Sequence, residues 1–261
     1  MIIAGWIARS RADGHSVRSW SAPGAGRAAL VAGILLLAAP WTGTAAARTH
    51  QASAVKPTQE LVTLLSSHEA LLRPFAGSRS LGVVQARRPI TEGRTMLPVL
   101  GHKTSSDGRR WLHVGIPGRP NGRSGWISKR ATVLAVTYWH IVVSTSSRRV
   151  TVYRHGRRVR VFSAIVGKAS TPTPLGTFFV EESIKLSPGA VGAPFALALS
   201  ARSNVLQEFA GGPGQIALHG LTNVGGTLGT AASHGCVRLD NGAMSWLVRR
   251  VGPGTPVTIT G

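Results

Sequence analysis

Cysteine and acidic residues are both scarce in this 261-residue chain. Its single cysteine, Cys236, rules out an intramolecular disulfide. Asp and Glu number 9 against 30 Lys and Arg, which gives a formal net charge of +21. The sequence has no Cys-x-x-Cys or His-Glu-x-x-His motif, no Gly-rich phosphate loop and no internal repeat. It therefore gives no support for the common zinc-binding or nucleotide-binding classes of protein.

The positive charge favours anionic partners, but its pattern argues against nucleic acid. Aromatic residues make up only 6% of the chain and do not alternate with basic ones, as they do in single-strand binders. We therefore expect no nucleic-acid partner and retain anionic wall polymers or a membrane surface as candidate contacts. Scattered arginine is also what a plain composition bias produces.

Long apolar runs are missing as well. The longest, residues 28–39, is shorter than the roughly 20 residues that span a bilayer, and Pro40 ends it. Four arginines precede the run, and a small-residue stretch, Ala45-Ala46-Ala47, follows it. This pattern predicts a signal peptide over residues 1–47 and an exported protein, periplasmic or associated with the cell wall. The alternative is an uncleaved leader that anchors the chain to the membrane.

Residues 48–79 are predicted to form a linker and one short helix. The segment up to Lys56-Pro57 is polar, as in a flexible linker. Over residues 58–73 leucines recur at helical spacing, Glu60 lies in the first turn, and Pro74 ends the pattern. We expect this helix to pack against the rest of the protein and to have no catalytic role.

Residues 80–136 are predicted to form a small β module. Short apolar stretches at 81–84, 95–100, 111–116 and 125–127 alternate with turn pairs such as Asp107-Gly108 and Asn121-Gly122. The segment W-L-H-V-G-I-P-G-R-P-N-G-R-S-G-W-I resembles a bacterial SH3-like module. In such a module Trp111 and Trp126 would flank a barrel corner, and either wall adhesion or simple core packing would account for them.

Residues 137–261 are predicted to form a second, larger β domain. Strands are expected at 138–144, 150–153, 159–166, 177–180 and 257–260. One helix is expected from Asn241, as its N-cap, to about Arg250.

The chemistry is concentrated between residues 219 and 238. His219-Gly220 is followed by a glycine-rich loop and then by Ser233-His234-Gly235-Cys236-Val237-Arg238. A thiol becomes nucleophilic when a neighbouring imidazole accepts its proton. Gly235 lets a substrate approach the backbone closely, so the amides of Gly235 and Cys236 are candidates for an oxyanion site.

These segments resemble the L,D-transpeptidases with a YkuD-type catalytic fold, whose signature is His-Gly, a variable loop, and Ser/Thr-His-Gly-Cys with a following arginine. Residues 166–180 and 254–259 also look like landmarks of that family. The resemblance implies a mainly β fold, a YkuD-type β-sandwich with a short helix preceded by the SH3-like barrel. It further implies that Cys236 attacks, His219 accepts the proton and the Gly220 carbonyl orients the imidazole.

The remaining roles carried over by the resemblance concern the flanking residues. His234 would support the thiolate or shape the oxyanion loop, Ser233 would buttress that loop, and Arg238 would recognise a substrate carboxylate. The substrates would be peptidoglycan stem peptides, with no cofactor and no metal, and the oligomeric state stays open.

The resemblance also implies that Cys236 forms a thioester with a tetrapeptide stem, releases D-alanine and passes the acyl group to an amine of a neighbouring stem. Several alternatives remain at this point. The same thioester could be resolved by the amine of a wall-anchored protein, or by water, which would make the protein an L,D-carboxypeptidase. The chain could instead be a wall-binding protein without catalysis, its cysteine could be an inert core residue, or His219, His234 and Cys236 could bind zinc.

Overall fold

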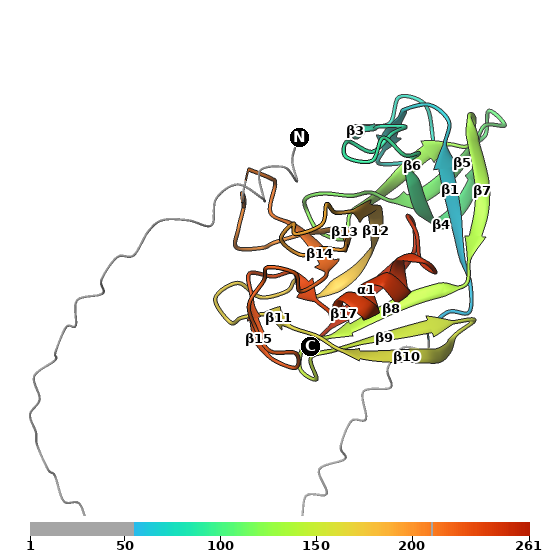
Figure 1. The fold of residues 1–261 in the computed structure, drawn as a ribbon. Helices are drawn as coiled ribbons and strands as arrows, with labels where there is room; N and C mark the ends of the chain where they lie inside the picture. Colours follow the sequence, from blue (N-terminus) through green and yellow to red (C-terminus); the bar gives the residue numbers. More distant parts are fainter. Residues whose placement is uncertain (1–54, 210) are drawn as a thin grey trace, which may run out of the picture. The chain divides into compact units, whose positions relative to one another are not determined.

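The computed structural model describes residues 55–209 and 211–261, which form two large β-sheets, a two-stranded sheet and one short helix (Figure 1). The predicted signal peptide, residues 1–47, and residues 48–54 of the predicted linker lie outside the described residues. Within the described residues, no helix is both long enough and apolar enough to cross a bilayer.

The first sheet forms the N-terminal β unit, residues 59–137. Its strand order is β3-β2-β6-β5-β4-β1-β7. Its core contains Val62, Leu64, Leu97 and Leu112, none of which has any solvent exposure. The strands are β1 (Gln59–Leu64), β2 (His68–Leu71), β3 (Ser80–Val84), β4 (Met96–Thr104), β5 (Arg110–Gly115), β6 (Ser124–Ser128) and β7 (Thr132–Thr137).

The helix predicted over residues 58–73 is wrong, because this segment forms β1 and β2. Val62 and Leu64 are fully buried on alternate positions of β1, whereas Leu65 and Leu72 are 47% and 46% exposed. β1 lies between β4 and β7, whose backbones supply its hydrogen bonds. Tertiary pairing thus overrides a leucine spacing that fitted a helix, and the N-terminal β unit begins at Gln59 instead of residue 80.

The two tryptophans of this unit have different surroundings. Trp111 is 6% exposed, whereas Trp126 is half-buried and stacks on His113, with ring centroids 4.8 Å apart. The β character predicted for this region is present. The SH3-like likeness of the unit stays a prediction.

The second sheet, with strand order β10-β9-β8-β17-β12-β13-β14-β16, forms the C-terminal domain. Helix α1 (Asn241–Val248) packs on it through Ala243, Met244 and Leu247. The strands are β8 (Trp139–Ser144), β9 (Arg149–Arg154), β10 (Arg157–Ser163), β12 (Gly176–Lys185), β13 (Phe195–Arg202), β14 (Gln215–His219), β16 (Val237–Arg238) and β17 (Pro256–Thr260), and β11 (Val166–Gly167) pairs with β15 (Ala231–Ser233) in the small sheet.

The N-cap of α1 is Asp240, one residue before the predicted cap. The Asp240 carboxylate accepts a hydrogen bond from the Ala243 amide at 2.8 Å. Asn241 is the first residue of the helix, and its Oδ1 accepts from the Leu221 amide at 2.8 Å. Asn241 therefore fixes the segment that follows His219-Gly220.

Strand β12 joins the two cores. Side chains alternate across a strand, so Phe178 packs in the core of the C-terminal domain while Phe179 packs in the core of the N-terminal β unit. Gly115 packs closely beside Pro98 and Phe179, since a Cβ there would lie 3.1 Å from Pro98 Cγ and 3.4 Å from the edge of the Phe179 ring.

Replacing Phe179 with Ala should remove the apolar link between the two units. Truncating a buried Phe costs about 3–5 kcal/mol of unfolding free energy, and Phe179 is 4% exposed. Urea unfolding should show this loss, whereas Leu175→Ala, at a side chain 57% exposed, should change the unfolding free energy by less than about 0.5 kcal/mol. Equal losses in the two variants would contradict the packing described.

Candidate active site

Parallel pairing of β14 with β16 brings the two signature segments together. Leu218 lies opposite Val237, and His219 lies opposite Arg238. Cys236 precedes Arg238 by two residues, and alternate residues of an extended chain face the same side. Cys236, His219 and Arg238 consequently line one cavity of about 40 Å³.

His219 is held by backbone groups. It is 3% exposed, and its Nδ1 lies 2.8 Å from the Gly220 carbonyl. Because a carbonyl only accepts, Nδ1 carries the proton and Nε2 is the basic nitrogen. The imidazole packs closely on Gly192, where a Cβ would lie only 2.7 Å from Nδ1. The contact between His219 and the Gly220 carbonyl, which the family resemblance implied, is thus present.

Hydroxyl groups fix the turn that carries Cys236. Ser233 Oγ donates to the Cys236 carbonyl at 2.6 Å and accepts from the Gly235 amide at 3.1 Å. Thr173 donates to the Gly235 carbonyl at 2.8 Å, and Thr171 donates to the Ser233 carbonyl at 3.2 Å. Gly235 has φ of +115°, a conformation that favours glycine. Ser233 therefore buttresses the turn, as expected.

The Gly235 amide does not fit the oxyanion role predicted for it. Its hydrogen is committed to Ser233 Oγ inside the turn, so it is not directed at a substrate. The sequence shows which backbone groups are near the cysteine but not which of them the turn itself uses. The Cys236 amide is the remaining candidate of the two.

His234 lies at the edge of the cavity. Its side chain is exposed and stacks on Phe209, with ring centroids 5.6 Å apart. The pKa of His234 is lowered, first by burial and then by the charges of Lys168 and Arg238. This position suits a residue that shapes the cavity mouth.

Sequence reasoning missed most of the cavity lining. No motif marks these residues, because they contribute apolar surface and backbone from the segment before β14 and from β14 itself. They are Ser203, Leu206, Phe209, Gly214, Gln215 and Ile216.

The zinc alternative finds no support in this geometry. Among residues 55–209 and 211–261, no three His, Cys, Asp or Glu side chains are grouped so that they could hold a metal ion.

Arg238 closes one side of the site. Its Nη1 donates to the Gly225 carbonyl at 2.6 Å, which ties down the glycine-rich loop. Its Nε is buried and has no hydrogen-bond partner among the described residues. A buried unpaired guanidinium nitrogen is costly and gains from an anionic ligand.

Burial keeps both reacting groups neutral. It lowers the pKa of His219 to about 4, with a further decrease from Arg238 and an opposing increase from the Gly220 hydrogen bond. Burial also raises the pKa of the Cys236 thiol, although Arg238 opposes this. The thiol Sγ lies 4.0 Å from the Gln215 carbonyl, a weak contact that suits an S–H group. At pH 7 the free site therefore holds a thiol and an imidazole, not an ion pair.

The fold and the site together define a class of protein: a mainly β domain whose sheet edge presents a cysteine and a histidine to one cavity. Comparison with known proteins narrows this class to one family. Residues 138–259 match the family described as YkuD, the L,D-transpeptidase catalytic domain, so the C-terminal domain is a YkuD-type domain.

Curated relatives are similar to part of this chain. YkuD of Bacillus subtilis (strain 168) is 31% identical over 121 residues, which are 46% of this chain and 65% of that protein. L,D-transpeptidase 1 of Mycobacterium tuberculosis (strain H37Rv) is 29% identical over 132 residues, which are 46% of this chain and 49% of that protein. This chain thus spans less than two thirds of the length of either relative.

Solved L,D-transpeptidase structures align with this chain at low TM-scores. An L,D-transpeptidase from Mycobacterium tuberculosis H37Rv has a TM-score of 0.42 and 16% identity, covering 76% of this chain and 96% of that chain. An L,D-transpeptidase from Mycobacterium smegmatis has a TM-score of 0.38 and 18% identity, covering 77% and 99%.

The low pKa of His219 predicts an acid-labile fold. Between pH 6.5 and about 4 the unfolded chain takes up a proton at this imidazole that the folded chain does not, so stability falls as the pH falls. A shift from 6.5 to about 4 corresponds to roughly 3 kcal/mol. Urea unfolding at pH 7 and pH 4.5 should show most of this loss in the wild type and less of it in His219→Gln. Cys236→Ala, which keeps the imidazole, should retain the wild-type loss, and an equal loss in His219→Gln would argue against a buried neutral His219.

Proposed function

We propose that this chain is a peptidoglycan L,D-transpeptidase that uses Cys236 as nucleophile and His219 as base. One observation carries the proposal: the pairing of β14 with β16 places Cys236, His219 and Arg238 on the same cavity. A buried imidazole oriented by a carbonyl beside a half-buried thiol suits acyl transfer. The family match of residues 138–259 supplies the substrate class.

The first half of the reaction acylates the cysteine. The sulfur attacks the carbonyl between the third residue of a tetrapeptide stem and its terminal D-alanine, while the thiol proton passes to His219 Nε2. The carbon–nitrogen bond then breaks, and the D-alanine amine leaves with that proton. The product is a thioester on Cys236.

The second half transfers the acyl group to a neighbouring stem. A side-chain amine attacks the thioester and gives its proton through His219 to the departing sulfur. The new amide joins the third residues of two stems without ATP, because the amide bond already cleaved supplies the free energy. His219 thus acts once as a base and once as an acid in each half of the reaction.

The neutral state of the Cys236 thiol and the His219 imidazole before substrate binds indicates when the thiol proton moves. Since burial raises the pKa of Cys236 and lowers that of His219, a free thiolate is unfavourable before substrate arrives. Proton transfer therefore accompanies attack, and Arg238 stabilises the developing negative charge on sulfur. In the same position, the buried Nε of Arg238 can bind a substrate carboxylate.

Two other functions fit the same fold. Water could resolve the thioester, which gives an L,D-carboxypeptidase. Alternatively the chain could bind the cell wall without catalysis. The ordered Ser233 turn and the backbone-held His219 favour catalysis, because a vestigial site has no need of either.

The place of action follows from the substrate. Peptidoglycan lies outside the cytoplasmic membrane, so the function requires export, which agrees with a signal peptide over residues 1–47. The net charge of +21 would favour contact with anionic wall polymers or the membrane surface.

A disaccharide-tetrapeptide should form a thioester on Cys236 of the purified chain, detectable by mass spectrometry as an added mass on the peptide containing that residue. Cross-linked dimer would identify the transferase, and free tripeptide stem would identify the carboxypeptidase. Cys236→Ala should form no adduct while keeping its fold by circular dichroism. Normal acylation of Cys236→Ala would overturn the assignment, and no adduct on a folded wild type would favour wall binding.

His219→Gln should slow acylation by roughly 10² or more, because a positioned general base contributes about that factor. The variant keeps a polar side chain of similar size, so a folded protein is expected. Single-turnover mass spectrometry measures the rate directly. A decrease smaller than about threefold would remove His219 from the base role.

The acylation rate should fall as the pH decreases through about 4. His219 must be neutral to accept the thiol proton, and burial lowers its pKa to about 4. The value of kcat/KM for acylation should therefore stay nearly constant from pH 7 to pH 5 and fall below that. A limb near pH 6.5 would show that the base is hydrated in the working enzyme.

A further inference from the structure

One side of the active-site cavity comes from a segment that the N-terminal β unit holds in place. This wall segment comprises residues 203–209 and 211–214. Four of its residues line the cavity that contains Cys236: Ser203, Leu206, Phe209 and Gly214. The wall segment is therefore the surface that a stem peptide bound at Cys236 would contact.

Arg119 binds the wall segment at three points. Its Nη2 donates to the carbonyls of Ser203 at 2.8 Å and Leu206 at 3.0 Å, and its Nη1 donates to the carbonyl of Pro213 at 2.8 Å. Arg119 belongs to the loop between β5 and β6 of the N-terminal β unit, so it lies outside residues 138–259. One rigid guanidinium thus ties together the start, middle and end of the segment.

The wall segment is shaped to receive this guanidinium. Gly214 has φ of +61°, and a Cβ there would lie 2.0 Å from the Leu206 carbonyl oxygen and 3.2 Å from Arg119 Nη2. The Ser203 amide donates to the Gly214 carbonyl at 2.8 Å, which closes the loop, and Ser203 Oγ accepts from the Leu206 amide at 3.0 Å. The three carbonyls consequently converge on one point.

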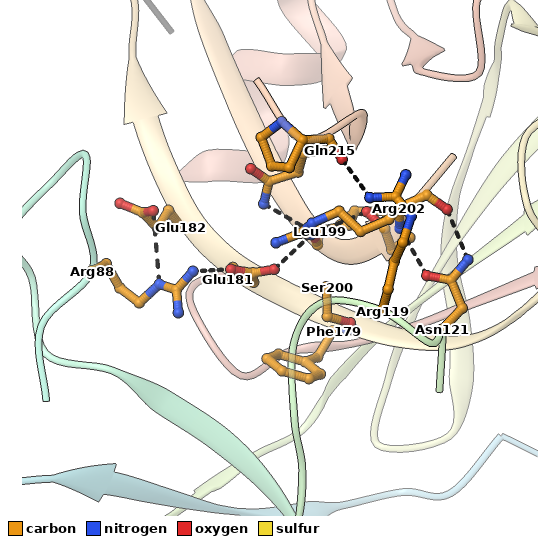
Figure 2. A network of polar contacts seen from close by, with 12 residues as sticks. Arg88, Arg119, Asn121, Phe179, Glu181, Glu182, Leu199, Ser200, Arg202 and Gln215 are labelled. Atoms are coloured by element: carbon orange, nitrogen blue, oxygen red, sulfur yellow. Dashed lines mark hydrogen bonds and ion pairs between the residues drawn. The ribbon is translucent and has the colours of Figure 1, made fainter. Parts of the chain in front are cut away.

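Asn121 anchors the base of the wall segment. Its Nδ2 donates to the Arg202 carbonyl at 2.7 Å, and its Oδ1 accepts from the Arg202 amide at 2.8 Å, as a paired strand would (Figure 2). Arg202 in turn donates to Glu181 at 2.9 Å, and Arg88 of the N-terminal β unit pairs with the same carboxylate. Glu181 is buried, so these charges are mutually satisfied and the base is firmly held.

We propose that Arg119 is a positioning residue for acyl transfer: it holds the wall segment against Cys236, so that the N-terminal β unit forms part of the substrate-binding surface. This inference rests on the proposed function for its substrate. Loss of the guanidinium frees three carbonyls and lets the wall segment move away from the sulfur. Substrate binding then weakens, whereas the His219 base and the Cys236 turn keep their own contacts.

The test compares Arg119→Ala with Arg94→Ala in the full chain. Arg94 is the matched control, because its guanidinium also donates to a backbone carbonyl, that of Leu65 at 2.6 Å, but within the N-terminal β unit. Three quantities are measured: hydrogen exchange of peptides covering residues 203–209, the rate of Cys236 alkylation by iodoacetamide, and kcat and KM for acylation by a disaccharide-tetrapeptide.

Arg119→Ala should raise KM by about tenfold and change kcat by less than about threefold, as expected for lost binding without lost chemistry. Exchange over residues 203–209 should speed up. Alkylation should become several-fold faster, because a more hydrated sulfur ionises more readily. Arg119→Lys, which keeps the charge but not the fork, should lie between the wild type and Arg119→Ala. Arg94→Ala should match the wild type in all three.

A purely structural role for Arg119 would lower the melting temperature of Arg119→Ala without moving KM, alkylation or local exchange, and that result would overturn the proposal. If the wild type is not acylated by the tetrapeptide while alkylation and exchange still respond to Arg119→Ala, then the proposed function fails and the positioning stands. Should Arg119→Ala not fold, Arg119→Lys provides the same comparison, and wild-type values for it in all three measurements would overturn the proposal.

Discussion

The short parallel ladder between β14 and β16 is the constraint on which the site depends. It involves only two registered pairs, Leu218 with Val237 and His219 with Arg238, yet it joins segments on either side of a glycine-rich loop. Leu218 and Val237 are fully buried in the domain core. The apolar partners therefore secure the register, and the register places the reactive side chains together on one cavity.

Burial at this sheet edge has an electrostatic consequence. A thiolate–imidazolium pair would need both charges in a poorly hydrated place, and burial acts against each of them. Arg238 helps the thiolate but opposes the imidazolium, so it does not stabilise the pair as a whole. Under the proposed function, charge would form when the substrate carbonyl is present to share it, which is the moment when such stabilisation accelerates a reaction.

The sequence predicted the features that depend on neighbours along the chain. The helix near residues 241–250 and the strands before and after turns such as Asn121-Gly122 follow from local chemistry. The contact between His219 and the Gly220 carbonyl was implied by the family resemblance and not by local chemistry. Features fixed by distant partners were missed or wrong. The leucine spacing of β1 predicted a helix, because the sequence does not show that β4 and β7 pair with this segment. Strand β13 was not predicted, although it lies inside the second sheet.

The same difference between local features and features fixed by distant partners holds for the residues of the site. Motif residues such as Cys236 and His219 were singled out because their chemistry is unusual, and their roles stay predictions. The oxyanion role predicted for the Gly235 amide does not fit, because the fold directs its hydrogen to Ser233 Oγ. Phe209 and Leu206 carry no motif at all, and they line the cavity from a segment that Arg119 binds from outside the domain.

Part of the cavity wall is held by residues that lie outside the matched catalytic domain. The family match covers residues 138–259, and this range contains every residue of the motif. It does not contain Arg119, which binds the segment beside the cysteine, Asn121, which binds Arg202 at the base of that segment, or Arg88, which pairs with Glu181. Under the proposed function, the motif would supply the chemistry while a neighbouring unit shapes the surface that contacts the substrate. Differences in that unit would then change substrate binding without changing any residue of the Cys236 motif.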